Sequence, residues 1–482
     1  MLFNSIQFAV FLPVVFLLYW FVFDRFIRRS RHQLRLQNAF IVVASYVFYG
    51  CWDWRFLLLI AFTSFCSWGS GLLIGNNRGD KKAKRWMWAN VILNLGILGL
   101  FKYYDFFVSE FAQLMHVSSD GLLLKVVLPV GISFYTFQAL SYSIDVYRGK
   151  MEPTRDIVSF FAFISFFPQL VAGPIERATN LLPQFQKKRE FDYDTAVDGV
   201  RQILWGLFKK MVVADNCAIY VDQVFATPES HSGSTLLLAA FFFAFQIYGD
   251  FSGYSDIAIG TAKLFGIKLM RNFNVPYFSR DIAEFWRRWH ISLTTWFRDY
   301  VYIPMGGSRV SKVKVVRNTF VIFLLSGFWH GANWTFLVWG AFHALLFLPL
   351  ILRGKNRRYT NRIAEGRWFP SIKETGQMLL TFVLVVVGWV FFRSNSLGQA
   401  WVVLKGIADI TLFSAPLVIV GLKKTVFVII LLLIVEWFHR EKDHAFSIER
   451  WPVVVRFAAS YLLLLMVLEL GGNSQSFIYF QF

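Results

Sequence analysis

The sequence predicts an all-α protein that crosses a membrane many times. Hydrophobic residues make up 56% of the 482 residues and only 16% are charged, whereas a soluble domain carries charge on about a quarter of its residues. The mean hydropathy is +0.49. Apolar segments recur along the whole chain with short loops between them. We therefore expect about ten to thirteen spans in a single integral membrane domain, residues 1–482.

The apolar segments define the expected elements in order. The first 24 residues lack a basic start and a small-residue cleavage site, so they predict a retained helix rather than a signal peptide. The segments lie near residues 6–23, 38–52, 56–75, 87–104, 122–144, 157–173, 200–218, 234–262, 318–329, 334–352, 376–392, 414–438 and 452–469.

The net charge of +19 is explained by membrane topology rather than by nucleic-acid binding. Basic residues cluster in residues 25–35 and 78–85, on alternate connections between apolar segments. Such loops stay in the cytoplasm, which places the N-terminus outside. Residues 103–121 carry three acids and predict an external loop. No nucleic-acid partner is expected, and the lipid bilayer is the expected partner of the basic surface.

Residues 157–173 do not fit this alternation. Basic residues flank them on both sides, at 148–155 and at 187–189, so both flanks are predicted to be cytoplasmic. We therefore expect this segment to enter the membrane and return without crossing it.

An uncharged run of 35 residues, from Asn318 to Leu352, contains His330. As one helix it would be about 50 Å long, against a hydrocarbon core of about 30 Å. Gly331, Ala332 and Asn333 provide a break, which leaves a helix of roughly a dozen residues before His330. An ionisable side chain at such a break is expected to face protein or a water-filled cavity.

His330 is the main candidate for chemistry. A neutral imidazole can take a proton from a hydroxyl as that hydroxyl attacks an acyl carbon, and burial keeps a histidine neutral. Asn333 could orient the ring or the substrate. The alternative is a structural histidine at a helix break. For His343, in the following segment, a hydrogen-bonded core residue is the favoured interpretation.

Residues 281–298 predict an amphipathic helix in the membrane interface. Aromatic and aliphatic side chains recur at helical spacing, with charged side chains on the other face. His290 lies at the border of the two faces and could position a substrate or simply fill that border. Arg287 and Arg288 could bind phosphates of an acyl carrier, with lipid headgroups as the alternative partner.

Asp250 and Asp256 follow a strongly apolar stretch and predict a bent helix with internal hydrogen bonds. They could cap and pack helices, or mark an ion path in a transporter. Cys51, Cys66 and Cys217 show no metal or disulfide spacing, so no metal site is expected. The motifs of phosphate loops, zinc proteases and serine-hydrolase elbows are absent, which argues against an ATP-driven pump or a metalloprotease.

Together these motifs resemble the membrane-bound O-acyltransferase (MBOAT) family, and in particular its alginate-acetylating branch. The similarity extends from the first helix to the last residue. It is carried by residues 169–175, 206–215, 250–260, 272–281, 285–293, 302–307, 327–331 and 477–482.

This resemblance implies a fold of about 11 transmembrane helices with further re-entrant and interfacial helices around a thin centre. It implies that His330 is the catalytic histidine and that His290 is the second one. The candidate substrate-binding residues of this site are Asn333, Trp329, Arg287, Arg288, Asp250 and Asp256.

The resemblance also implies an activity. Acetyl-CoA would be the cytoplasmic donor, with no tightly bound cofactor. An extracytoplasmic acetyltransferase partner would place the acetyl group on a polysaccharide acceptor, in the inner membrane of a Gram-negative bacterium. Peptidoglycan or cellulose are alternative acceptors. A transporter that uses Asp250 and Asp256, or a non-catalytic scaffold, are alternatives of other classes.

Overall fold

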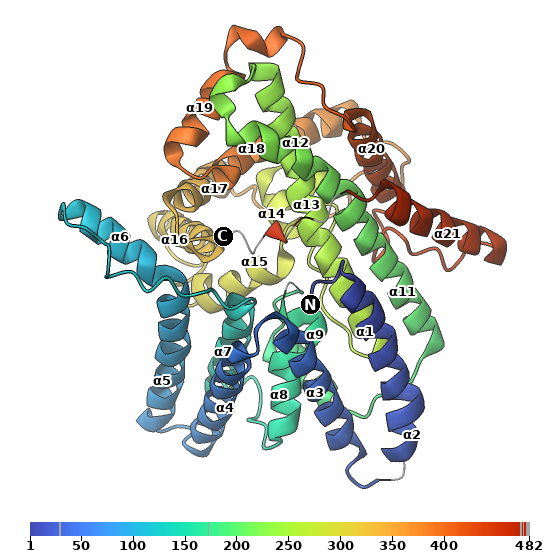
Figure 1. The fold of residues 1–482 in the computed structure, drawn as a ribbon. Helices are drawn as coiled ribbons and strands as arrows, with labels where there is room; N and C mark the ends of the chain where they lie inside the picture. Colours follow the sequence, from blue (N-terminus) through green and yellow to red (C-terminus); the bar gives the residue numbers. More distant parts are fainter. Residues whose placement is uncertain (28–29, 172, 473–474, 476, 479–482) are drawn as a thin grey trace. The chain divides into compact units, whose positions relative to one another are not determined.

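The structure, a computed structural model, is built from helices joined by loops (Figure 1). It describes residues 1–482 except 28–29, 172, 473–474, 476 and 479–482. No strand occurs among these described residues, which confirms the all-α prediction. The helices form two compact units, Met1–Val200 with Ile257–Met270, and Arg201–Asp256 with Arg271–Phe482.

The first unit contains the N-terminal helices. They are α1 (Ile6–Leu17), η1 (Leu18–Phe23), α2 (Asp24–Ile27), α3 (Gln33–Asp53), α4 (Arg55–Asn76), α5 (Lys81–Leu98), η2 (Gly99–Tyr103), α6 (Tyr104–Leu114), α7 (Ile132–Tyr147), α8 (Ile157–Ser165), α9 (Phe167–Leu170), α10 (Ala178–Phe185) and the start of α11 (Tyr193–Leu207).

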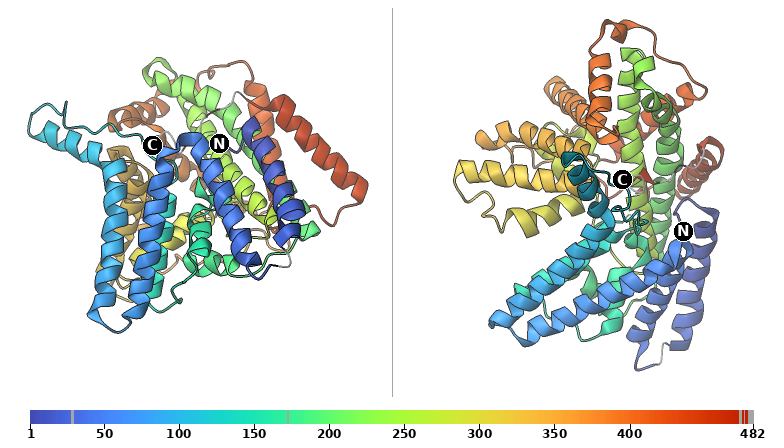
Figure 2. Two further views of the ribbon diagram at one scale, coloured as in Figure 1. Left: turned by 60° about the horizontal axis from the view of Figure 1, so that its bottom comes forward. Right: turned by 60° about the vertical axis from the view of Figure 1, so that its left-hand side comes forward.

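Helices α4, α5 and α7 pack together, and α4 and α5 run side by side in all views (Figures 1 and 2). The three helices approach one another closely and are joined by buried hydrogen bonds. A Cβ atom on Gly71 would lie 2.3 Å from the Tyr142 ring. The Asn90 amide donates to Ser143 Oγ at 2.6 Å and accepts from Ser67 Oγ at 3.1 Å. Small residues and buried amides of this kind hold membrane helices together.

The second unit contains the rest of the chain. Its helices are the end of α11, η3 (Phe208–Ala214), α12 (Asp215–Ala226), η4 (Pro228–Ser230), most of α13 (Gly233–Leu264), η5 (Pro276–Phe278), α14 (Ile282–Arg288), α15 (Ile291–Phe297), η6 (Arg298–Tyr302), α16 (Lys312–His330), α17 (Trp334–Leu352), α18 (Ile372–Arg393), α19 (Leu397–Ile407), η7 (Ile410–Phe413), α20 (Leu422–Phe438) and α21 (Val453–Leu470).

The multi-pass prediction is confirmed. Within the described residues, seven helices are long and apolar enough to cross a membrane. They are Ile6–Ile27, Arg55–Asn76, Lys81–Leu114, Gly233–Leu264, Trp334–Leu352, Ile372–Arg393 and Val453–Leu470. The count of about 11 stays a prediction.

Several elements differ from their expected bounds. The expected external loop at 103–121 is helical through Leu114, and α6 leaves the axis of α5 after the π-helical turn η2 (Figure 1). Residues 122–131 are not helical, so α7 begins only at Ile132. α13 is one continuous helix of 32 residues through Asp250 and Asp256.

The segment at 157–173 contains only short helices. α8 has nine residues, so it is about 13 Å long and cannot cross a 30 Å core. It ends at Ser165, and Pro168 lies in the first turn of α9. The entry and return of this segment stay a prediction.

Candidate active site

His330 ends α16, as the sequence predicted, and the break that follows it is confirmed. Gly331 is extended and α17 begins at Trp334. The predicted length of the helix before His330 is wrong. α16 has 19 residues, or about 28 Å, because the helix starts at Lys312, before the apolar run that begins at Asn318.

Two glycines bring α16 and α17 into backbone contact next to His330. A Cβ atom on Gly327 would lie 2.1 Å from the Phe336 carbonyl oxygen. A Cβ atom on Gly340 would lie 2.4 Å from the Phe323 carbonyl oxygen. The short loop and these two contacts fix the end of α16, and with it the histidine.

The His330 ring lies in an aromatic environment and is 3% exposed. Its centroid is 5.1 Å from that of Trp329 and 5.2 Å from those of Trp339 and Phe392. Asn333 caps α17. Its side chain accepts from Thr335 N at 2.9 Å and donates to the Asn395 carbonyl at 3.0 Å.

The predicted single amphipathic helix at 281–298 is wrong. It is two short helices, α14 and α15, separated by Trp289 and His290. His290 has a left-handed backbone, with φ 43° and ψ 53°. The polar face is not solvent-facing as a whole, because Glu284 and Arg288 are 1% and 8% exposed. Periodicity could not reveal this burial, since it depends on charge partners elsewhere in the fold.

His290 lies in the same aromatic environment as His330. Their ring centroids are 6.3 Å apart, and the Trp329 ring is 5.8 Å from His290. His290 is 1% exposed, and burial lowers its pKa to about 3. Its Nδ1 atom lies 3.1 Å from Asn272 Oδ1. The site therefore joins two histidines from separate elements, one of them held neutral at physiological pH.

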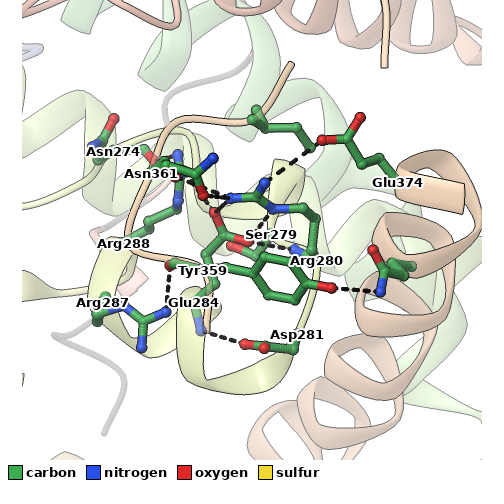
Figure 3. A network of polar contacts seen from close by, with 12 residues as sticks. Asn274, Ser279, Arg280, Asp281, Glu284, Arg287, Arg288, Tyr359, Asn361 and Glu374 are labelled. Carbon is green, nitrogen blue, oxygen red and sulfur yellow. Dashed lines mark hydrogen bonds and ion pairs between the residues drawn. The ribbon is translucent and has the colours of Figure 1, made fainter. Parts of the chain in front are cut away.

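Arg288 of α14 takes part in a buried ionic network with Arg280 and Glu284 (Figure 3). The Glu284 carboxylate forms ion pairs with two arginines. Its Oε1 atom lies 3.0 Å from Arg280 Nη2 and 2.7 Å from Arg288 Nη2. Arg287 is exposed and donates to the carbonyls of Asn356 and Tyr359. Arg288 is thus paired with a carboxylate inside the fold, whereas Arg287 remains at the surface.

Asp250 and Asp256 both have lysine partners, which sequence reasoning missed. Lys210 Nζ lies 2.8 Å from Asp250 and 2.8 Å from Asp215, and Lys209 pairs with Asp256. Asp250 also accepts from Ile478 N at 2.6 Å. Two adjacent lysines in the apolar segment 200–218 were the available signal, because such charges need acidic partners in a membrane.

His343 is fully buried against Phe285, Trp286 and Trp339. Neither of its ring nitrogens has a hydrogen-bond partner among the described residues. The expected hydrogen bond is therefore not found there, although the core position is. Over the same residues, no group of three or more His, Cys, Asp or Glu is placed to hold a metal ion.

The chain is similar to known acyltransferases. The family model of the membrane-bound O-acyltransferases matches residues 153–360, a region that includes His290 and His330. The probable alginate O-acetylase AlgI of Pseudomonas aeruginosa is 40% identical over 407 residues, which cover 83% of this chain and 74% of the relative.

Two relatives act on other polymers according to their names. The peptidoglycan O-acetyltransferase of Helicobacter pylori is 36% identical over 437 residues, covering 85% of this chain and 80% of the relative. The teichoic acid D-alanyltransferase of Bacillus subtilis is 30% identical over 282 residues, covering 55% of this chain and 69% of the relative.

Proposed function

Because this chain belongs to the membrane-bound O-acyltransferase family, we propose that it carries acetyl groups from cytoplasmic acetyl-CoA to an exopolysaccharide of the alginate type outside the cell membrane. The observation that carries the proposal is the pair of buried histidines, whose rings lie 6.3 Å apart in one aromatic environment.

In the proposed reaction His330 is the general base. Its imidazole takes the proton of an acceptor hydroxyl while the hydroxyl oxygen attacks the thioester carbonyl carbon. The carbon–sulfur bond breaks, the acetyl group stays on the acceptor oxygen, and the imidazolium returns its proton to the departing thiolate. The acceptor is a sugar hydroxyl or a relay nucleophile supplied by a partner.

His290 supports this step as a second, neutral imidazole. Its low pKa is favourable here, because two charged imidazoliums 6.3 Å apart would repel each other and neither could accept a proton. Trp329 precedes His330 directly and Asn333 lies three residues after it, and both are candidate substrate contacts.

The donor would approach from the cytoplasm. Arg287 is exposed and can meet phosphates of acetyl-CoA without leaving its two carbonyl partners, since a guanidinium has five N–H donors. Arg288 would contribute mainly through its positive charge, because its side chain is bound to Glu284. An extracytoplasmic acetyltransferase partner would then place the acetyl group on the polymer, at the inner membrane of a Gram-negative bacterium.

Peptidoglycan is the second candidate acceptor, favoured by the similarity to the Helicobacter pylori enzyme. The two candidates share the donor half of the reaction and differ only in the acceptor and its partner protein. Supplying each polymer with its cognate partner to the same proteoliposomes would separate them.

Transfer from labelled acetyl-CoA in proteoliposomes tests the proposal. His330→Ala should lower the rate about 10²- to 10⁴-fold, the usual contribution of a general base. His343→Leu is the matched control, because His343 is an equally buried histidine one helix later. We expect the control to keep the parent rate within about threefold. Equal rates in the parent and the His330 variant would refute the assignment.

A further inference from the structure

His290 is held by a second segment of backbone. The N–H of Ile291 donates to the Asn272 carbonyl and the N–H of Asn274 donates to the Arg288 carbonyl, both at 2.9 Å. These two bonds bracket His290, whose left-handed backbone is uncommon for a residue other than glycine. Residues 272–274 therefore hold the strained turn between α14 and α15 through these two backbone hydrogen bonds.

The side chain of Asn272 has one allowed orientation. The backbone N–H of Ser292 lies 3.3 Å from Oδ1 and can only donate, so the amide oxygen must face it. The reverse orientation would set two donors against each other. The Asn272 Nδ2 group donates to Ser255 Oγ on α13 at 3.1 Å, and the residue is fully buried.

This orientation decides which nitrogen of His290 carries the proton. The Asn272 oxygen only accepts, and it lies 3.1 Å from His290 Nδ1, so a lone pair on Nδ1 would face a lone pair on oxygen. Ser292 Oγ cannot relieve that conflict, because it lies 2.9 Å from the same Asn272 oxygen and 3.4 Å from Nδ1. Nδ1 is therefore protonated.

The other ring nitrogen is then the free acceptor. His290 Nε2 is buried and has no hydrogen-bond partner among the residues that the structure describes. The ring is packed by Phe251 on α13, by Phe273 and by Trp329, and His330 is the titratable side chain that faces it.

We propose that Asn272 is a positioning residue for the acyl transfer: by accepting from Nδ1 it fixes the tautomer and the orientation of His290, so that Nε2 presents a lone pair in the two-histidine site. The tautomer follows from geometry alone, and its catalytic consequence rests on the proposed function. Nε2 would accept a hydrogen bond from the acceptor hydroxyl or from protonated His330.

The tautomer can be measured without any activity. In protein labelled with ¹⁵N-histidine, the His290 signals are identified as those lost in His290→Gln. We expect a pyrrole-type Nδ1 and a pyridine-type Nε2 in the parent. Asn272→Asp keeps an acceptor and should keep this tautomer, whereas Asn272→Leu should lose the preference.

Ser255→Ala is the matched control, because it removes the acceptor of the Asn272 Nδ2 group and leaves the contacts of Oδ1 in place. It should leave the tautomer unchanged. A protonated Nε2 in the parent, or the parent tautomer in Asn272→Leu, would overturn the proposal. If Asn272→Leu does not fold, the Asp variant is measured above its raised pKa, where His290 is neutral. A neutral ring with its proton on Nε2 rather than Nδ1 contradicts the proposal equally.

The pH profile gives the second readout. A carboxylate beside Nδ1 stabilises the imidazolium and so raises the pKa of His290 above its low parent value. Asn272→Asp should therefore lose activity as pH falls through the raised pKa and recover it at higher pH, while the parent stays flat there. Asn272→Leu should lower kcat about 10- to 100-fold at every pH, the usual cost of losing such a supporting contact.

The two hypotheses fail separately. A parent that transfers no acetyl group but shows the Nδ1–H tautomer refutes the proposed function and leaves the role of Asn272 on His290 intact. An active parent in which Asn272→Asp and Asn272→Leu lose activity equally, without a shift in the pH profile, shows that Asn272 is only structural.

Discussion

Asn333 shows how one residue can carry two competing roles. Its side chain caps α17 through Thr335 N and also ties the loop to the Asn395 carbonyl. A helix cap contributes about 1 kcal/mol, and serine can replace asparagine in it. Capping is therefore separable from any contact that needs the amide.

We predict that Asn333→Ala lowers the free energy of unfolding by about 1 kcal/mol and that Asn333→Ser restores most of it. If the amide also binds substrate, Asn333→Ser will be stable yet raise KM or lower kcat. Thermal unfolding in detergent, beside acetyl transfer in proteoliposomes, measures both. Full activity in the serine variant would assign Asn333 to the helix cap alone.

Individual site residues differed in how far the sequence could identify them. His330 was recognisable because an ionisable residue stands before a glycine in a long uncharged run. The sequence did not reveal that Lys209 and Lys210 form ion pairs with the buried acids, or that Asn272 contacts His290. Their roles depend on contacts across 18 to 47 positions of sequence, such as Asn272 to His290 and Lys209 to Asp256.

At the scale of elements, the crossing of α16 and α17 supports the site. Gly327 and Gly340 each face a carbonyl oxygen of the opposite helix, which cannot move aside as a side-chain end could. A methyl group at either position must push the helices apart, and overpacking of this kind costs about 1–3 kcal/mol.

We predict that Gly340→Ala destabilises the protein by about 1–3 kcal/mol and lowers acetyl transfer, since it displaces the end of α16 that carries His330. Gly376→Ala is the control. Gly376 is exposed on α18 with no atom near its Cβ position, so alanine there should stabilise by up to about 1 kcal/mol. Equal unfolding temperatures for the two variants would contradict the close-contact argument.

Helix type was predictable from composition, but helix ends were not. The apolar segment was expected near residues 318–329, yet the basic residues from Lys312 to Arg317 form the first turns of α16. The helical pattern of 281–298 continues through His290 in the sequence, whereas the structure interrupts the helix at Trp289 and His290. In both cases tertiary contacts determine where the helix begins or ends, and such contacts cannot be derived from a single sequence.

At the scale of the whole molecule, the distribution of charge makes a directional prediction. Basic loops at 25–35 and 78–85 should be cytoplasmic, and the loop near Asp120 should be external. Lys82 and Asp120 are both exposed, so either position can carry a probe.

We predict that Lys82→Cys reacts with a membrane-impermeant thiol reagent only after the cell membrane is opened, and that Asp120→Cys reacts in intact spheroplasts. The background is a variant in which Cys51, Cys66 and Cys217 are replaced by alanine, which removes all native thiols. Labelling of Lys82→Cys in intact spheroplasts would reverse the proposed orientation and move the donor side to the outer face.

The loop that joins α17 to α18 is held in an unusual way. Arg280, Arg287 and Arg440 donate to its backbone carbonyls, at Asn356, Tyr359, Asn361, Ile363, Ala364 and Arg367. Every residue has a carbonyl, so these six bonds do not depend on which side chains the loop carries. Exposed side chains of the loop can therefore be exchanged without removing any of these six bonds.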